Sequence, residues 1–228
     1  MNKSKLILVR HGQSEWNKQD KFTGWVDVPL SSEGKKEAKV AGEEIKKLDI
    51  NFDYSFSSIL KRSIQTYEEI NKVCHINNEL IQDWRLNERH YGNLQGLNKQ
   101  EMRNLHGDEQ VLLWRRSYDV KPPKINLESH NKLINQECFK KVNINPFPKN
   151  ESLKDTVFRL KPFISNKLFP ILKLRKNIFI SAHGNSIRAM LKYIENISDE
   201  DIIKIEIPTG KPMLLEFNDN KLESKKYI

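Results

Sequence analysis

The apolar residues near the N-terminus form a short uninterrupted run. Residues 5–9 are KLILV, in which four aliphatic side chains follow one another, and the run ends directly at Arg10-His11-Gly12. A run of this length, rich in branched side chains, is typical of a strand buried on both faces of a sheet. We therefore predict a buried strand that ends in a sharp turn carrying Arg10 and His11.

The next segments alternate between helical and extended patterns. Within residues 30–48, apolar residues recur at spacings of three and four, which predicts a helix with Ser31 or Ser32 as its N-cap. Residues 53–57 resemble a second strand, and the apolar spacing from 59 to 70 predicts a second helix with Arg62 near its start. The predicted order is strand, helix, strand, helix.

The periodicity weakens between about residues 85 and 150. Residues 86–99 are rich in turn-forming residues, residues 100–118 have a helical pattern, and residues 121–149 form a long irregular insertion. Long insertions in compact domains often serve as lids over a binding site. We therefore expect a lid at about 121–149.

The regular alternation returns in the last third of the chain. Residues 151–172 are predicted to form a helix strained near Pro162, residues 177–194 a strand, a His-Gly turn and a helix, and residues 212–217 the last strand. The whole predicts a single domain over 1–228 with an α/β fold, in which a mainly parallel sheet lies between two helical layers. Ligands bind such sheets beyond the carboxyl ends of the strands, where both His-Gly turns lie.

The composition is that of a folded protein with excess positive charge. The 228 residues are 37% hydrophobic, which is enough for a packed core. No apolar stretch is long enough for a membrane span, and the N-terminal run is too short for a signal peptide, so we expect a cytoplasmic protein that does not bind membranes. The net charge of +9 suits an anionic ligand but does not identify one, because the lysines are scattered through every segment.

Two histidines occupy equivalent positions far apart in the sequence. His11 and His183 each follow an apolar strand and precede a glycine, so both imidazoles can project into one crevice. Arg10 lies beside the first, and Asn185 and Ser186 begin the helix after the second. Either histidine alone would suit a structural role at a strand end. Together, with an arginine and a helix N-terminus that favour anions, they predict a catalytic anion-binding crevice.

The sequence pattern does not favour a metal or a nucleotide as the source of the chemistry. The six histidines show no H-x-x-x-H pair, Cys74 and Cys138 are far apart, and no phosphate-binding G-x-x-x-x-G-K-[ST] motif occurs. We therefore expect no metal. Phosphoryl transfer without one requires positive side chains, and the candidates are Arg10, Arg62, Arg115 and Arg116.

Several motifs in chain order resemble those of one family. They are LVRHGQSEWN, FTGW, LKRSIQT, LNERHYGNLQGLNK, GDEQV with WRR, and SAHGNSIRA. The chain resembles the cofactor-dependent phosphoglycerate mutases of the histidine phosphatase superfamily from about Lys5 to Tyr227. RHG alone is common to the superfamily, whereas NERHYGNLQGLNK followed by WRR is characteristic of the mutase branch. The resemblance implies a histidine phosphatase-like fold and interconversion of 3-phosphoglycerate and 2-phosphoglycerate in glycolysis and gluconeogenesis.

The resemblance also implies a role for each matching residue. His11 is then the nucleophile that becomes phosphorylated, primed by 2,3-bisphosphoglycerate, and Glu88 gives and takes the proton of the substrate hydroxyl. His183 and Arg10 stabilise the transferring phosphoryl group. The phosphoryl pocket is completed by Asn17, Arg62, Gly184 and Asn185, with Thr23 and Gly24 beside it. The substrate's carboxylate and remaining phosphate are held by Arg89, Tyr91, Lys99, Arg115 and Arg116.

The sequence departs from the family pattern in two places. Many members continue past the last strand with a tail that folds over the site, whereas this sequence ends at Tyr227-Ile228. Because water must be kept from a phosphorylated intermediate, we expect a measurable bisphosphoglycerate phosphatase activity. Gln13 stands where glutamate is common, which changes the charge more than the shape of the side chain.

Two other functions stay open at this stage. One is a phosphatase of the same superfamily acting on small phosphorylated metabolites, in which water takes the phosphoryl group from His11. The other is a nucleic-acid-binding protein, suggested by the charge and the Trp and Tyr residues, although no recognised binding motif occurs. The resemblance favours small phosphorylated three-carbon acids over nucleic acid as partners, and implies a homodimer or homotetramer.

Overall fold

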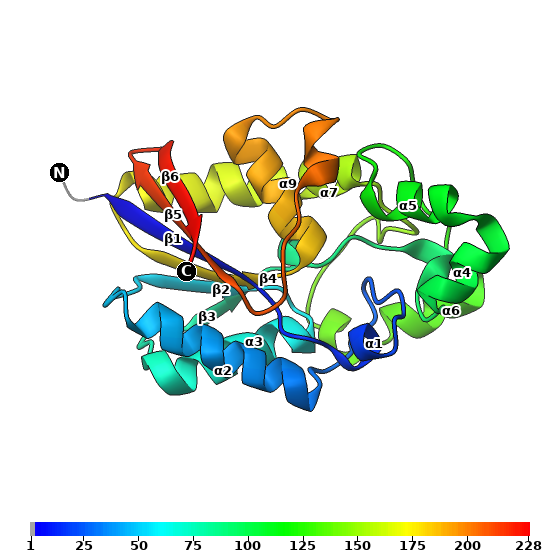
Figure 1. The fold of residues 1–228 in the computed structure, drawn as a ribbon, viewed down its shortest axis with the longest axis horizontal. Coiled ribbons are helices and arrows are strands. Elements are labelled where there is room, and N and C mark those ends of the chain that lie inside the picture. The colour runs from blue at the N-terminus through cyan, green and yellow to red at the C-terminus, as the bar shows by residue number, and fades with distance from the viewer. Residues whose placement is uncertain (1–2) are drawn as a thin grey trace.

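A six-stranded sheet forms the centre of the protein, whose computed structural model describes residues 3–228 (Figure 1). The strand order is β3-β2-β4-β1-β5-β6, in which β3, β2, β4 and β1 are parallel and β5 and β6 are antiparallel to their neighbours. The predicted mainly parallel sheet is therefore confirmed. The strands are β1 (Ser4–Arg10), β2 (Tyr54–Ser57), β3 (Leu80–Gln82), β4 (Ile178–Ala182), β5 (Pro212–Asn218) and β6 (Lys221–Tyr227).

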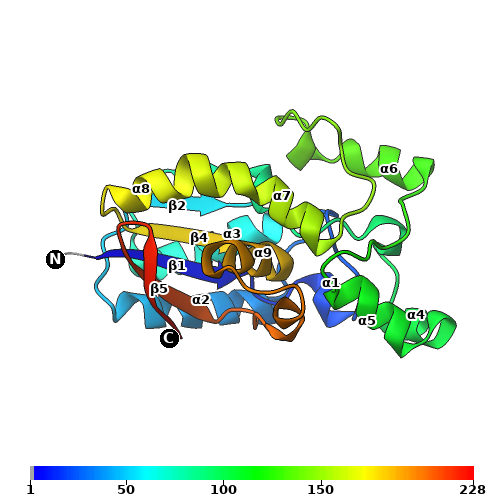
Figure 2. The same ribbon diagram turned by 90° about the horizontal axis from the view of Figure 1, so that it is seen from above.

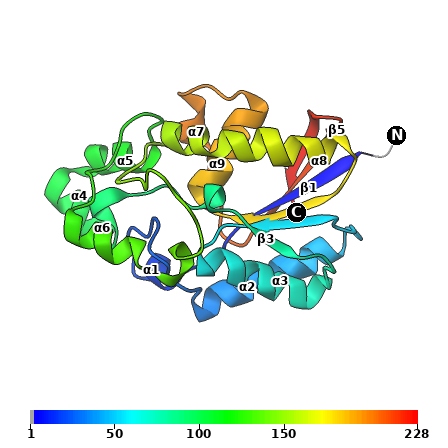
Figure 3. The same ribbon diagram turned by 180° about the vertical axis from the view of Figure 1, so that it is seen from behind.

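Helices cover both faces of the sheet (Figure 3). One layer is α2 (Ser32–Lys46) and α3 (Lys61–Cys74), and the other is α7 (Leu153–Phe163), α8 (Phe169–Lys173) and α9 (Gly184–Glu195). Alternate residues of β1 enter the two cores: Ile7 packs with α2 and α3, and Leu6 packs with α7 and α9. This alternation follows from the period of two along a strand, and it confirms the three-layer prediction.

Residues between β3 and α7 gather beyond the end of the sheet opposite to the N-terminus (Figure 2). The helices there are α4 (Lys99–His106), α5 (Asp108–Arg116) and α6 (Leu127–Ile134), close to the short α1 (Glu15–Lys18). Single 3₁₀ turns occur at Trp84–Leu86, Gly92–Leu94 and Glu137–Phe139, and another at Asp201–Lys204. None of the helices within residues 3–228 combines the length and apolar character needed to cross a membrane.

The structure corrects several predicted elements. The helix expected over 100–118 is broken into α4 and α5, because Gly107 has a φ of 83° that a right-handed helix does not allow. The insertion at 121–149 is not wholly irregular, since it contains α6. The helix predicted over 151–172 is found, by contrast: α7 contains Pro162 and continues through a π-helical turn at Ile164–Leu168, just after the proline, into α8.

Two strands, β3 and β6, were not predicted from the sequence, each for a different reason. β3 is only three residues long, which leaves too little sequence for a period to be seen. β6 lies at the sheet edge, and its residues KLESKKY are mostly polar and exposed, so no strand pattern is visible and the strand at 212–217 is not the last one. Lysines on an edge strand prevent it from pairing with a second chain, which accounts for this composition.

Candidate active site

The topology brings the two predicted histidines together. β1 and β4 are parallel neighbours in which Arg10 pairs with Ala182, so the residues that follow them, His11 and His183, leave the sheet side by side. Their ring centroids are 4.9 Å apart in an edge-to-face arrangement, and the Nε2 of His183 is 2.7 Å from the Oγ of Ser58, which follows β2. The two imidazoles therefore lie side by side, as predicted, but only His11 lines the cavity beyond the strand ends.

Two glycines allow the turn after β1 to pass close to α2. A Cβ on Gly12 would lie 2.2 Å from the carbonyl oxygen of Gly34, and a Cβ on Gly34 would lie 2.0 Å from that of Gln13. No side chain fits at these distances, so the turn that carries His11 can sit against the first turn of α2 only with glycine at both positions.

Replacing Gly12 with alanine is therefore expected to destabilise the protein. The new methyl group must push apart two backbone segments, which costs about 1–3 kcal/mol for an overpacked site. The free energy of unfolding from urea titrations measures the loss. Gly184→Ala is the control, because its Cβ would make an ordinary contact of 3.5 Å with Arg10. Equal free energies of unfolding for Gly12→Ala and the unsubstituted protein would contradict the prediction.

His11 has one nitrogen available as a nucleophile. Its Nδ1 is 2.7 Å from the carbonyl oxygen of Gly12. Because a carbonyl can only accept, Nδ1 carries the hydrogen, and the lone pair lies on Nε2. Burial, followed by the charges of Arg62 and Arg10, holds the pKa of His11 well below its usual value. The imidazole is therefore neutral and nucleophilic at physiological pH.

Two arginines bring positive charge to the floor of the site. Arg62, near the start of α3, is fully buried and donates to the carbonyls of Gly24 at 2.6 Å and Val26 at 3.0 Å. Arg10 donates to the carbonyl of Ile207 at 2.6 Å. Within residues 3–228, the Nε–H of each arginine has no hydrogen-bond partner. Burial lowers the pKa of Arg62 to about 10, so both guanidiniums stay charged and can bind an anion.

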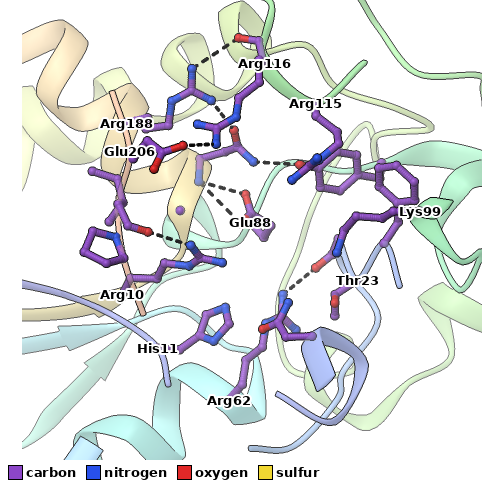
Figure 4. Close-up of a pocket in the computed structure, with 18 of the residues that line it drawn as sticks. Arg10, His11, Thr23, Arg62, Glu88, Lys99, Arg115, Arg116, Arg188 and Glu206 are labelled. Atoms are coloured by element: carbon purple, nitrogen blue, oxygen red, sulfur yellow. Dashed lines mark hydrogen bonds and ion pairs between the residues drawn. The ribbon is translucent and has the colours of Figure 1, made fainter. Parts of the chain in front are cut away.

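The carboxylate of Glu88 lies across the cavity from His11 (Figure 4). It follows the 3₁₀ turn at Trp84–Leu86, and its Oε1 accepts from the backbone N–H of Arg89 at 2.7 Å and of Asn185 at 3.1 Å. Asn185 is in the first turn of α9, where backbone N–H groups have no partner within the helix. The carboxylate is therefore held by main-chain donors, and Glu88 as a residue is only 9% exposed.

The cavity encloses about 500 Å³ and opens toward a cationic rim. Lys99, Arg115 and Arg116 lie on the side away from His11 (Figure 4). Arg116 donates to the carboxylate of Glu206 at 2.8 Å, and Lys99 lies 3.0 Å from that of Asp20. The floor and the rim together offer positive charge at two places, which suits a ligand with two separated anionic groups.

The cavity lining contains most of the predicted site residues. They are Arg10, His11, Asn17, Thr23, Gly24, Arg62, Glu88, Tyr91, Lys99, Arg115, Arg116, Gly184 and Asn185. His183 and Arg89 lie behind the lining and are fully buried. Arg89 reaches the site through its Nη2, which donates to the hydroxyl of Tyr91 at 3.3 Å.

Sequence reasoning missed other residues that line the cavity. They are Lys21, Phe22, Arg188, Glu206, Ile207, Pro208 and Tyr227. Arg188 could have been found, because it is one helical turn after Gly184 in the strand–turn–helix segment and so shares its face. Residues 206–208 and Tyr227 lie in segments without a motif, and only the folded chain brings them to the site. No cluster of three or more potential metal-ligating side chains occurs within residues 3–228.

Comparisons with known proteins agree with this geometry. The sequence profile of the histidine phosphatase superfamily (branch 1) matches residues 6–137. The 2,3-bisphosphoglycerate-dependent phosphoglycerate mutase of Buchnera aphidicola subsp. Cinara cedri is 48% identical over 228 residues, covering 100% of this chain and 99% of its own. The 2,3-bisphosphoglycerate-dependent phosphoglycerate mutase 2 of Lactiplantibacillus plantarum is 47% identical over 224 residues, 96% of each chain. This chain is a member of the 2,3-bisphosphoglycerate-dependent phosphoglycerate mutase family.

Solved structures show the same fold across the histidine phosphatase superfamily. A phosphoglycerate mutase from Bacillus anthracis has a TM-score of 0.71 at 20% identity, covering 100% of this chain and 93% of that one. A mycobacterial glucosyl-3-phosphoglycerate phosphatase has a TM-score of 0.72 at 21% identity, covering 93% and 92%. Mutases and phosphatases therefore share this fold, and the fold alone does not separate the two activities.

Proposed function

We propose that this protein interconverts 3-phosphoglycerate and 2-phosphoglycerate through a phosphorylated His11, primed by 2,3-bisphosphoglycerate. The observation that carries the proposal is the placement of neutral His11, two buried arginines and Glu88 in one cavity whose rim holds a second set of cations. The names of the full-length relatives support it.

The residues of the cavity fit the bisphosphorylated primer. Arg10 and Arg62 each keep an unpartnered buried Nε–H, and the buried hydroxyl of Thr23 also lacks a partner within residues 3–228. These groups would hold one phosphate, and Lys99, Arg115 and Arg116 would hold the other and the carboxylate. The primer, when bound, supplies the phosphoryl group that first converts His11 to its phosphorylated form.

The chain's own residues divide the reaction between them. Glu88 takes the proton from the free hydroxyl of 3-phosphoglycerate while that oxygen accepts the phosphoryl group and the bond to Nε2 of His11 breaks. Arg10, Arg62 and His183 stabilise the charge on the phosphoryl oxygens during transfer. The same steps then run in reverse at the oxygen that carried the original phosphate. Its phosphoryl group passes to Nε2 of His11, and Glu88 returns the proton to that oxygen, which releases 2-phosphoglycerate.

A phosphatase of the same superfamily is the alternative, since water could take the phosphoryl group from His11. The rim favours the mutase, because a phosphatase needs no cations that hold a second anionic group while the molecule reacts at either oxygen.

We extend the proposal to a cytoplasmic enzyme for small phosphorylated three-carbon acids, assembled as a homodimer or homotetramer. Light scattering after gel filtration tests the assembly. The lid role of residues 121–149 also stays a proposal.

Conversion of 3-phosphoglycerate to 2-phosphoglycerate tests the proposed function. The assay is run in a chelator, with and without a trace of 2,3-bisphosphoglycerate, and released inorganic phosphate is measured in parallel. We expect chelator-resistant mutase activity that rises with the trace. Release of inorganic phosphate without 2-phosphoglycerate would refute the mutase and establish the phosphatase.

Glu206 is expected to weaken substrate binding by neutralising Arg116. The two side chains lie 2.8 Å apart at the rim, so an anionic substrate must compete with this carboxylate. We expect Glu206→Gln to lower the KM for 3-phosphoglycerate about two- to fivefold, since exposed ion pairs contribute up to about 1 kcal/mol. Added salt should shrink the difference. Glu128→Gln, at an ion pair on α6, is the control, and equal KM values in both variants would contradict the prediction.

A further inference from the structure

A buried ion pair lies beside the segment that carries Glu88. The Nε of Arg159 on α7 is 2.7 Å from Oε1 of Glu151, and its Nη2 is 3.0 Å from Oε2. Both side chains are only 5% exposed. Removing two charges from water is unfavourable, and replacing such a pair with apolar residues is often neutral or stabilising. A role other than stability is therefore the natural explanation for its presence.

Arg159 binds the main chain of the segment that leads to Glu88. Its Nη1 donates to the carbonyl of Arg85 at 2.6 Å and to that of Asn87 at 3.2 Å. Its Nη2 donates to the carbonyl of Glu88 itself at 3.1 Å. One rigid guanidinium thus binds three carbonyls within residues 85–88, which the single point charge of a lysine cannot do.

Glu151 holds the other end of the same segment. Its Oε2 accepts from the backbone N–H of His90 at 2.9 Å, while its own N–H donates to the carbonyl of His90 at 2.8 Å. Between these two anchors, the carbonyl of Glu88 also accepts from Nε1 of Trp25. The main chain at Glu88 is therefore held by groups outside the cavity, while its carboxylate accepts from the backbone N–H of Asn185, which lines the cavity.

We propose that Arg159 and Glu151 are positioning residues that hold Glu88 where it can exchange a proton with the substrate. This inference rests on the proposed function. Neither residue lines the cavity, so neither touches the substrate. They act by fixing the main chain, because a proton-transfer group displaced by about 1 Å can lose on the order of 10²-fold in rate.

The test is a double-mutant cycle between Arg159 and Glu88. Arg159→Lys keeps the charge beside Glu151 but loses the guanidinium N–H groups that bind the three carbonyls. We expect kcat for 3-phosphoglycerate to fall about 10–100-fold, while KM stays within about twofold of the unsubstituted value. If Arg159 acts through Glu88, the same change in a Glu88→Gln background costs less than about threefold, since the group that it positions is already gone. A merely structural role would give the same loss in both backgrounds.

Lys192→Met is the matched control, because it removes a similarly buried cation that pairs with Asp199 outside the cavity. Its kcat should stay within about twofold of the unsubstituted protein. Should Arg159→Lys not fold, Glu151→Gln/Arg159→Gln removes both charges together and should show the same loss of kcat. Unchanged kcat or additive losses overturn the inference, whereas an unsubstituted protein without mutase activity refutes the proposed function itself.

Discussion

Replacing His11 with alanine is expected to lower kcat for 3-phosphoglycerate conversion on the order of 10⁴-fold or more. The lone pair of Nε2, set by the bond from Nδ1 to the carbonyl of Gly12, is the proposed acceptor of the phosphoryl group. The neighbouring His183 does not replace it, because His183 is fully buried and does not line the cavity. Intact mass after incubation with 2,3-bisphosphoglycerate should show one phosphoryl group in the unsubstituted protein and none in His11→Ala.

His106→Ala controls for the general effect of removing an imidazole, since His106 is exposed at the end of α4 and outside the cavity. It should keep both the mass shift and the activity. A phosphorylated His11→Ala protein, or one that turns over at a comparable rate, would show that another residue accepts the phosphoryl group.

Acid should destabilise the protein from about pH 6.5 downward through its buried neutral histidines. Burial, followed by the charges of His130 and Arg159, lowers the pKa of His90 to about 3, and the pKa values of His11 and His183 are also held well below 6.5. In the unfolded chain a histidine takes up a proton near pH 6.5. Between that pH and the folded pKa the unfolded state therefore binds more protons, so each histidine removes about 1.4 kcal/mol of stability per pH unit as the pH falls.

His90→Asn isolates one such contribution. The Oδ1 of asparagine can accept from Gly92 as Nδ1 of His90 does at 3.0 Å, but it does not titrate. Between pH 6.5 and 5.0 we expect the free energy of unfolding to fall by about 2 kcal/mol less in this variant. His75→Asn is the control, since His75 is exposed and its left-handed backbone suits asparagine. Parallel curves for His90→Asn and the unsubstituted protein would show that His90 does not contribute.

Site residues at the ends of the parallel strands were easier to predict from the sequence than the residues that line the rest of the cavity. Arg10 ends one strand with an easily recognised apolar run, His11 and His183 follow two such strands, and parallel pairing brings the residues after them together. Glu206 and Tyr227 show no such signal, because their approach to the cavity depends on how residues 201–212 and β6 pack.

The insertion shows a second limit of periodicity. Its aromatic residues have no helical spacing, yet Phe139 and Phe147 pack on Trp25 with ring centroids 5.7 and 5.1 Å away. Trp25 comes from a distant part of the chain, so a pattern read along residues 121–149 alone could not reveal this core. A pattern along α7 alone also could not reveal the contacts of Arg159. Its partner Arg85 lies far earlier in the chain, and its partner Glu151 lies before the start of the helix.

The position of Tyr227 has a practical consequence for protein production. This residue lines the cavity, and its hydroxyl donates to the carbonyl of Glu206 at 3.0 Å, while the backbone N–H of Ile228 is tied to Pro212. A purification tag fused after Ile228 would emerge beside the mouth of the cavity, where its histidines or acidic residues could bind the rim. β1 starts at Ser4 and reaches the site only at Arg10, so a tag on the N-terminal side joins β1 at its end away from the site. Kinetic work on this protein should therefore use the N-terminal fusion.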